Sequence, residues 1–141
     1  AFSPLGRQFL TGKAVDVSHL SPDDIRATAA RPRFEPDVFA KNTKLLTPFG
    51  EIAKSLGLTM AQLSLAWLLA YPKASNNLSL IAIPGTKHIE YMNENWGAVA
   101  ATMSSEVFDT LDNLINEKTV EGNRYSDARM IDTDSERDRL R

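Results

Sequence analysis

The chain has 141 residues, of which 43% are apolar and 24% are charged, and this balance favours a globular protein of one domain or less. The net charge of -2 argues against a general nucleic-acid binder, which would present a basic surface to the phosphate backbone. The chain contains no cysteine, which excludes disulfide bonds, thiolate metal sites and thiol catalysis.

The sequence shows no sign of a membrane segment. No apolar run approaches the roughly 20 residues that a membrane-spanning helix needs. Ala1 to Gly6 also lacks the basic and then apolar regions of a signal peptide. We therefore expect no contact with a membrane and, by default, a cytoplasmic location. Ala1 to Gly6 reads like the end of a strand that enters a turn, so we expect the natural start to lie upstream.

The first half of the chain predicts a loop followed by helices. Residues 4–35 carry prolines and glycines without a sustained period, which indicates a long loop. Apolar residues then recur at helical spacing over residues 36–56, and Pro48 should kink or divide that helix.

A second helix is expected to begin at a capping box formed by Thr59 and Gln62. Its apolar residues lie on most sides, so it should be buried, and Pro72 should end it.

The second half predicts one strand and two helices. Residues 78–83 are short and almost continuously apolar, as in a strand that is covered on both faces. A turn at Pro84–Thr86 leads into a short helix with an apolar face of Ile89, Met92 and Trp96.

The last predicted helix begins at Ser104 as its N-cap, with Met103 and Phe108 as a hydrophobic staple. Beyond Glu117 the chain is polar, and residues 132–141 alternate in charge. We expect residues 126–141 to form a charged, mobile tail.

Helices that alternate with buried strands predict an α/β class. Two parallel strands cannot cover themselves, so the sheet or barrel must be completed by missing sequence or by another chain.

Three segments together resemble the aldo-keto reductases. Ser3–Arg7 reads Ser-Pro-Leu-Gly-Arg, and Ile83–Lys87 reads Ile-Pro-Gly-Thr-Lys. Between them, Pro32–Phe34, Asn42 and the stretch from Thr59 to Leu69 also resemble one subgroup of that family. The resemblance covers residues 1–125. It implies the C-terminal portion of a (β/α)8 TIM barrel, with the seventh and eighth strands and their following helices, incomplete in this chain.

The resemblance also implies a function and a cofactor. The family passes a hydride from a nicotinamide to a carbonyl, so an NADP(H)-dependent oxidoreductase that reduces aldehydes or ketones is expected. The family's catalytic tyrosine, lysine, aspartate and histidine lie on earlier strands, so no catalytic residue is predicted within this chain. No metal site is predicted either.

One group of expected cofactor-binding residues follows the first predicted strand end. Phe2 matches the family position whose ring stacks on the nicotinamide. Ser3, Leu5 and Arg7 match positions along the pyrophosphate, and Lys13 matches a lysine that contacts the cofactor. The alternative for this group is an ordinary turn with solvated basic residues.

A second group follows the second strand end. The resemblance implies that it binds the 2'-phosphate of the adenosine and the adenine, and its members are Gly85, Thr86, Lys87, His88, Tyr91, Glu94 and Asn95. The strand end, the glycine and the start of a helix suit an anion, and Lys87 adds a positive charge. The family more often has arginine at His88. NADPH stays the expected cofactor because of Lys87.

Two hypotheses remain open. The chain is part of a working reductase, with a small carbonyl substrate and a missing N-terminal barrel half. Alternatively, it is a non-catalytic nucleotide-binding or interaction protein on a truncated barrel, with exposed strand edges that favour a homo-oligomer.

Overall fold

A computed structural model describes residues 1–74, 79–131 and 133 of the chain. The chain divides into two compact units, and every residue of the two predicted cofactor-binding groups lies in the first. Unit 1 comprises Ala1–Val15 and Leu45–Ile115. Unit 2 comprises Asp16–Lys44 and Asn116–Arg141, the latter segment only as far as it is described.

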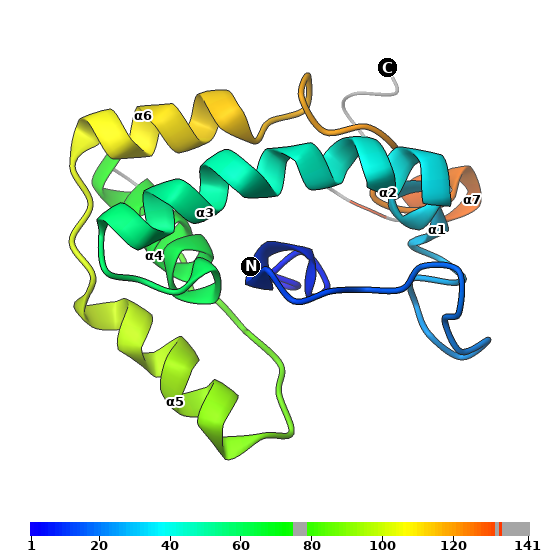
Figure 1. Ribbon diagram of the computed structural model, residues 1–141, viewed down its shortest axis with the longest axis horizontal. Coiled ribbons are helices and arrows are strands. Elements are labelled where there is room, and N and C mark those ends of the chain that lie inside the picture. Colours follow the sequence, from blue (N-terminus) through cyan, green and yellow to red (C-terminus); the bar gives the residue numbers. More distant parts are fainter. Residues whose placement is uncertain (75–78, 132, 134–141) are drawn as a thin grey trace. The chain divides into compact units, whose positions relative to one another are not determined.

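Helices account for most of the described secondary structure (Figure 1). Unit 1 holds the 3-10 helices η1 (Phe9–Thr11) and η3 (Ala98–Ala100) and the α-helices α3 (Leu46–Ser55), α4 (Met60–Ala74), α5 (Ile89–Gly97) and α6 (Ser105–Leu114). Unit 2 holds α1 (Arg31–Phe34), α2 (Pro36–Asn42) and α7 (Asp127–Met130). The 3-10 turn η2 (Thr43–Leu45) lies at the boundary.

The helix predicted over residues 36–56 is divided, as Pro48 led us to expect. The 3-10 turn Thr43–Leu45 separates α2 from α3, and Pro48 lies in the first turn of α3. Proline has no N–H to donate to the carbonyl four residues earlier, here Lys44, and its ring crowds that carbonyl. The break therefore precedes the proline by about one turn.

The predicted capping box of α4 is confirmed. The backbone N–H of Thr59 donates to Oε1 of Gln62 over 3.1 Å, and the backbone N–H of Gln62 donates to Oγ1 of Thr59 over 3.1 Å. The expected end at Pro72 is wrong, because the helix continues to Ala74. A proline one turn from a helix end removes a single backbone hydrogen bond, and the last residues can stay helical without it.

The core of unit 1 lies between α3, α4 and α6, which Figure 1 shows next to one another. Ser104 caps α6 as predicted, with its hydroxyl accepting from the N–H of Val107 over 3.3 Å. Leu63 of α4 and Leu111 of α6 are completely buried. Burial of such side chains contributes roughly 1.5–3 kcal/mol each, so packing rather than intrinsic propensity holds these helices together.

The strand predicted over residues 78–83 is not formed as a strand in the described part of the chain. One isolated parallel bridge joins Phe2 to Ile83, and Leu78 lies outside the described residues. A strand becomes regular only where it has a neighbour along its length, and here the segment at Ala1–Phe2 is the neighbour. Among the described residues, this bridge is the only β pairing that corresponds to the expected α/β fold.

Unit 2 contains one helix, α1, that the loop prediction for residues 4–35 missed, whereas α2 lies within the helix predicted over residues 36–56. Pro32 lies at the start of α1 and Pro36 at the start of α2, where the fixed φ of proline suits the first helical turn. The buried amide of Asn42 joins α2 to the later part of the unit. It donates to the carbonyl of Glu121 over 3.0 Å and accepts from the N–H of Glu121 over 2.9 Å.

The short helix α7 falls within the predicted tail, and the rest of that tail lies outside the described residues apart from Ser126, Ile131 and Thr133. Within the described part of the chain, no single helix is long and apolar enough to cross a membrane. One bent pair of consecutive helices reaches the required length and composition together.

Candidate functional site

The turn after the first residues is held in an unusual backbone conformation. Ser3 and Arg7 have φ values of 49° and 55°, in the left-handed region that side chains other than glycine seldom occupy. The N–H of Gly6 donates to the carbonyl of Ser3 over 2.9 Å, which closes the turn. Ser64 of α4 is 1% exposed and donates its hydroxyl to the carbonyl of Pro4 over 2.7 Å. The turn is thus attached directly to the core helix.

Parallel pairing brings this turn beside the one at Pro84–Thr86. The nitrogen of Ala1 donates to the carbonyl of Ile81 over 2.7 Å, and the N–H of Ile83 donates to the carbonyl of Ala1 over 3.1 Å. Because the two segments run in the same direction, both turns emerge at the same edge, where ligands bind in parallel sheets.

Helix α5 is fixed to the start of α4 by Gln62. The Nε2 atom of Gln62 donates to the carbonyl of Glu94 over 3.1 Å, while its Oε1 serves the capping box. A side chain at Gly97 would approach Nε2 of Gln62 to 2.7 Å, so this contact depends on glycine. One amide group therefore both caps α4 and positions α5.

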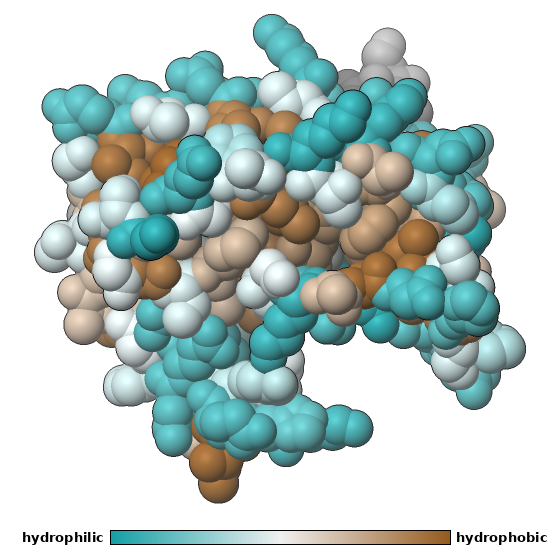
Figure 2. Space-filling model, in the orientation of Figure 1, coloured by the Kyte–Doolittle hydropathy of each residue, from teal (hydrophilic) through white to brown (hydrophobic). Residues whose placement is uncertain are grey.

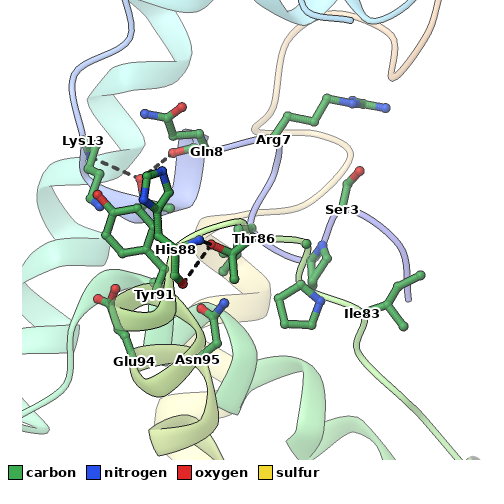
Figure 3. Close-up of a pocket in the computed structure, with 16 residues that line it drawn as sticks. Ser3, Arg7, Gln8, Lys13, Ile83, Thr86, His88, Tyr91, Glu94 and Asn95 are labelled. Carbon is green, nitrogen blue, oxygen red and sulfur yellow. Dashed lines mark hydrogen bonds between the residues drawn. The ribbon is translucent and has the colours of Figure 1, made fainter.

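A cavity of about 620 Å³ opens between these three elements (Figure 3). Ten of the twelve predicted cofactor-binding residues line it: Ser3, Leu5, Arg7, Lys13, Gly85, Thr86, His88, Tyr91, Glu94 and Asn95. The other two, Phe2 and Lys87, do not line it, and both side chains are exposed. The structure thus brings the two groups together, whereas their binding of a cofactor stays a prediction.

A charged cluster occupies one end of the cavity. The Nζ atom of Lys13 lies 3.3 Å from the centroid of the Tyr91 ring, a cation–π contact. The His88 ring meets the same tyrosine edge to face at 5.1 Å between centroids. The Nδ1 atom of His88 lies 3.6 Å from Oε1 of Glu90. Figure 3 shows Lys13, His88 and Tyr91 together, away from Ser3 and Ile83.

Sequence reasoning missed several residues that build the cavity. Gln8, Thr11 and Ala61 also line it. Two side chains of α4 hold lining residues in place by hydrogen bonds to their backbone. Ser64 donates to the carbonyl of Pro4, and Gln62 donates to the carbonyl of Glu94. A hydroxyl within the apolar run of α4 was the available signal for Ser64, since a buried hydroxyl needs a hydrogen-bond partner.

Asn95 is a polar side chain that lines the cavity. It is 9% exposed, and its amide makes no hydrogen bond to any other residue that the structure describes. Its amide atoms are open to the cavity, where water or a ligand can form hydrogen bonds with them. An amide both donates and accepts, so it suits a heterocycle with both kinds of group.

A second, apolar groove of about 310 Å³ lies on the other side of residues 80–84. Leu65 and Leu69 of α4 and Met92 and Trp96 of α5 form its walls. Large apolar side chains are exposed around it, including Ile81 at 78% and Trp96 at 77%. Figure 2 shows apolar atoms at the surface of unit 1 among hydrophilic ones.

Comparisons with known proteins agree on one family. Residues 1–116 match the Aldo/keto reductase family. The chain is similar to the aldo-keto reductase yakc [NADP(+)] of Schizosaccharomyces pombe, with 37% identity over 88% of this chain and 34% of that protein. It is also similar to the aldo-keto reductase str7 of Strobilurus tenacellus, with 35% identity over 92% of this chain and 36% of that protein.

A third relative is the probable aldo-keto reductase 1 of Glycine max, with 32% identity over 88% of this chain and 34% of that protein. The chain therefore spans about a third of the length of the curated relatives it matches.

Proposed function

Because the chain belongs to the aldo/keto reductase family, we propose that it forms the cofactor-binding portion of an NADP(H)-dependent oxidoreductase that reduces aldehydes or ketones. The name of the Schizosaccharomyces pombe relative includes NADP(+), which supports this choice of cofactor. The main structural support is the cavity that joins the turn at Ser3–Arg7 to the segment from Gly85 to Asn95.

The residues around the cavity fit a dinucleotide with a phosphorylated ribose. Lys13 contacts Tyr91 of α5, whereas Arg7 brings positive charge to the pyrophosphate end, where the turn at Ser3–Arg7 offers backbone donors. At the other end, the first turn of α5 lacks a side-chain cap, so its N–H groups are available to an anion. The space beside Gly85 is open, with no atom within 4 Å of where a side chain would begin. A phosphate can therefore approach the backbone there.

Each part of the cofactor is assigned to residues of this chain. Lys87 and His88 bind the 2'-phosphate, and Glu94 and Asn95 bind the amino group and ring nitrogens of adenine. Phe2 stacks on the nicotinamide, which supplies the hydride when the cofactor is bound. None of these residues moves a proton, so the catalytic groups come from the remaining part of the barrel.

We also propose that this chain contributes the seventh and eighth strands, with their helices, to a (β/α)8 barrel. The pairing of Ala1 with residues 81–83 supports this, because two parallel segments with a helix after each form the repeating unit of such barrels. Ala82 makes no backbone hydrogen bond to another residue among those described, so one edge is open. The rest of the barrel would cover that edge and the apolar groove.

The test of the proposed function is equilibrium binding of NADPH and NADH, measured by fluorescence titration at low ionic strength. We expect NADPH to bind more tightly than NADH, and Lys87→Gln to weaken NADPH binding about two- to fivefold while NADH binding stays the same. The matched control is Lys54→Gln, which removes an exposed lysine of unit 1 outside the cavity. Equal affinities for the two cofactors would contradict the assignment of Lys87.

The exposed groove favours one alternative, a non-catalytic interaction protein that docks on another chain. Both forms could bind NADPH, so reduction of an aldehyde by the full-length protein distinguishes them. NADPH binding without any turnover of a range of aldehydes and ketones would favour the alternative.

A further inference from the structure

His88 is placed where its charge affects one end of the proposed cofactor cavity. It lies at the N-cap of α5, lines the cavity, and touches both Tyr91 and Glu90. Histidine is the side chain that ordinarily changes its charge between pH 5 and 8. A positive charge on the His88 ring would therefore act directly on an anion bound at this end of the cavity.

The neighbouring charges come from three elements. On α5, Glu90 lies 3.6 Å from Nδ1 of His88, and Glu94 lines the cavity one turn later. Lys13, in the loop after η1, contacts the ring of Tyr91, which is also in contact with His88. Arg7 lines the cavity from the first turn, and Lys87 precedes His88 in the chain.

Backbone hydrogen bonds hold the two basic residues of this cluster in position. The N–H of His88 donates to Oγ1 of Thr86 over 3.1 Å, and the N–H of Lys13 donates to Oγ1 of Thr11 over 3.3 Å. The side chains around His88 carry three positive charges, from Arg7, Lys13 and Lys87, and two negative charges, from Glu90 and Glu94, so their sum is +1 when His88 is neutral. Protonation of His88 raises this sum to +2.

We propose that protonation of His88 strengthens the preference of this cavity for NADPH over NADH as the pH falls from 8 to 6. This inference rests on the proposed function, and it adds a regulation by pH to it. A phosphate monoester carries a charge between about -1.5 and -2 near pH 7, and NADH lacks that group. An imidazolium at the end of the cavity attracts the phosphate, whereas a neutral ring can only accept or donate one hydrogen bond.

The experiment measures the dissociation constants of NADPH and NADH for the full chain at pH 6, 7 and 8, at constant low ionic strength. The phosphate itself titrates near pH 6, so the comparison is made with His88→Gln in the same series. We expect the ratio of the NADH to the NADPH constant to rise about two- to fivefold more in the unmodified protein than in His88→Gln. His88→Arg should show a high ratio that varies with pH only as it does in His88→Gln.

Three outcomes separate the hypotheses. An equal change of the ratio in the unmodified protein and in His88→Gln would overturn the role of His88 while leaving the cofactor site intact. Loss of NADH binding by His88→Gln would also overturn it, because the residue would then act on the site as a whole. If the unmodified protein binds neither cofactor at any pH, the proposed function itself fails.

Discussion

Asp112 of α6 receives two hydrogen bonds from α4 through the same carboxylate oxygen. Nε1 of Trp67 and the hydroxyl of Tyr71 each donate to Oδ1 over 2.7 Å. Burial, together with the hydrogen bond and the negative charge of Asp112, raises the pKa of Tyr71 to about 12. At the scale of single residues, this phenol is therefore a sensitive reporter of the packing between α4 and α6.

A prediction follows from the sign of that shift. An unfolded tyrosine titrates near pH 10, so the contribution of Tyr71 to stability is complete below about pH 10. It is lost as the pH rises towards the folded value of about 12. We expect the free energy of unfolding, measured by urea titration between pH 9 and 12, to fall more steeply in the unmodified protein than in Tyr71→Phe.

The matched control is Tyr125→Phe, which removes a tyrosine from unit 2 and leaves the contact with Asp112 in place. Ultraviolet absorbance of the phenolate gives an independent reading of the same group. If Tyr71→Phe and the unmodified protein lose stability in parallel over this range, the hydroxyl does not stabilise the packing of the two helices.

At the scale of elements, features that depend on neighbouring residues were predictable from the sequence. Thr59 and Ser104 cap their helices as expected, because a cap needs only residues within one turn. The prediction of a regular strand over residues 78–83 was wrong, because such a strand depends on a partner that is distant in sequence. Pro32 at the start of α1 was read as part of a loop, although its rigid φ suits the first turn of a helix, whereas Pro36 was correctly read as the start of one.

For the candidate site, most of the residues that line the cavity were predicted, but the contacts that hold them in place were not. Resemblance to the family identified most of the lining, including Lys13 and His88, since those positions lie within recognisable segments. The supporting contacts of Gln62 and Ser64 were not predicted. Their partners, the carbonyls of Glu94 and Pro4, are backbone groups that any residue carries, so only the packing of α4 against α5 and the first turn reveals them.

Gln62 offers a test of how one element positions another. Gln62→Glu keeps an oxygen to accept from the N–H of Thr59 but loses the donor to the carbonyl of Glu94. One hydrogen bond contributes about 1 kcal/mol, so we expect amide hydrogen exchange across α5 to speed up about fivefold. Thr59→Ala is the control, because it removes the cap and should speed exchange only at the start of α4. Unchanged exchange in α5 of Gln62→Glu would show that another contact holds this helix.

At the scale of the whole molecule, the main question is what covers the apolar surface around residues 80–84. The family's barrels typically need about 250 residues, and the chain spans about a third of its curated relatives. Exposed Ile81 and Trp96, together with the open edge at Ala82, are what a barrel would show where its next strand and helix pack. A single explanation thus accounts for the exposed side chains and for the single bridge.

The two tryptophans allow this explanation to be tested, because Trp67 is 8% exposed and Trp96 is 77% exposed in the chain. Trp67→Phe leaves Trp96 as the only tryptophan of the 141-residue chain, and any tryptophan that a longer protein carries outside these residues is also replaced by phenylalanine. We expect acrylamide to quench its fluorescence strongly in the 141-residue chain and several times less in a full-length protein that also carries the proposed remaining strands. Trp96→Phe is the control, since Trp67 should resist quenching in both. Circular dichroism checks that each variant folds.

The concentration dependence of quenching separates a barrel from a dimer. Protection of Trp96 in the full-length protein at all concentrations supports cover by the protein's own remaining strands. Protection that appears in the 141-residue chain only as its concentration rises, with a dimer in sedimentation, supports a second copy instead. Strong quenching of Trp96 in the full-length protein at every concentration would mean that neither covers this face, and the proposed barrel closure at Ala82 would be wrong.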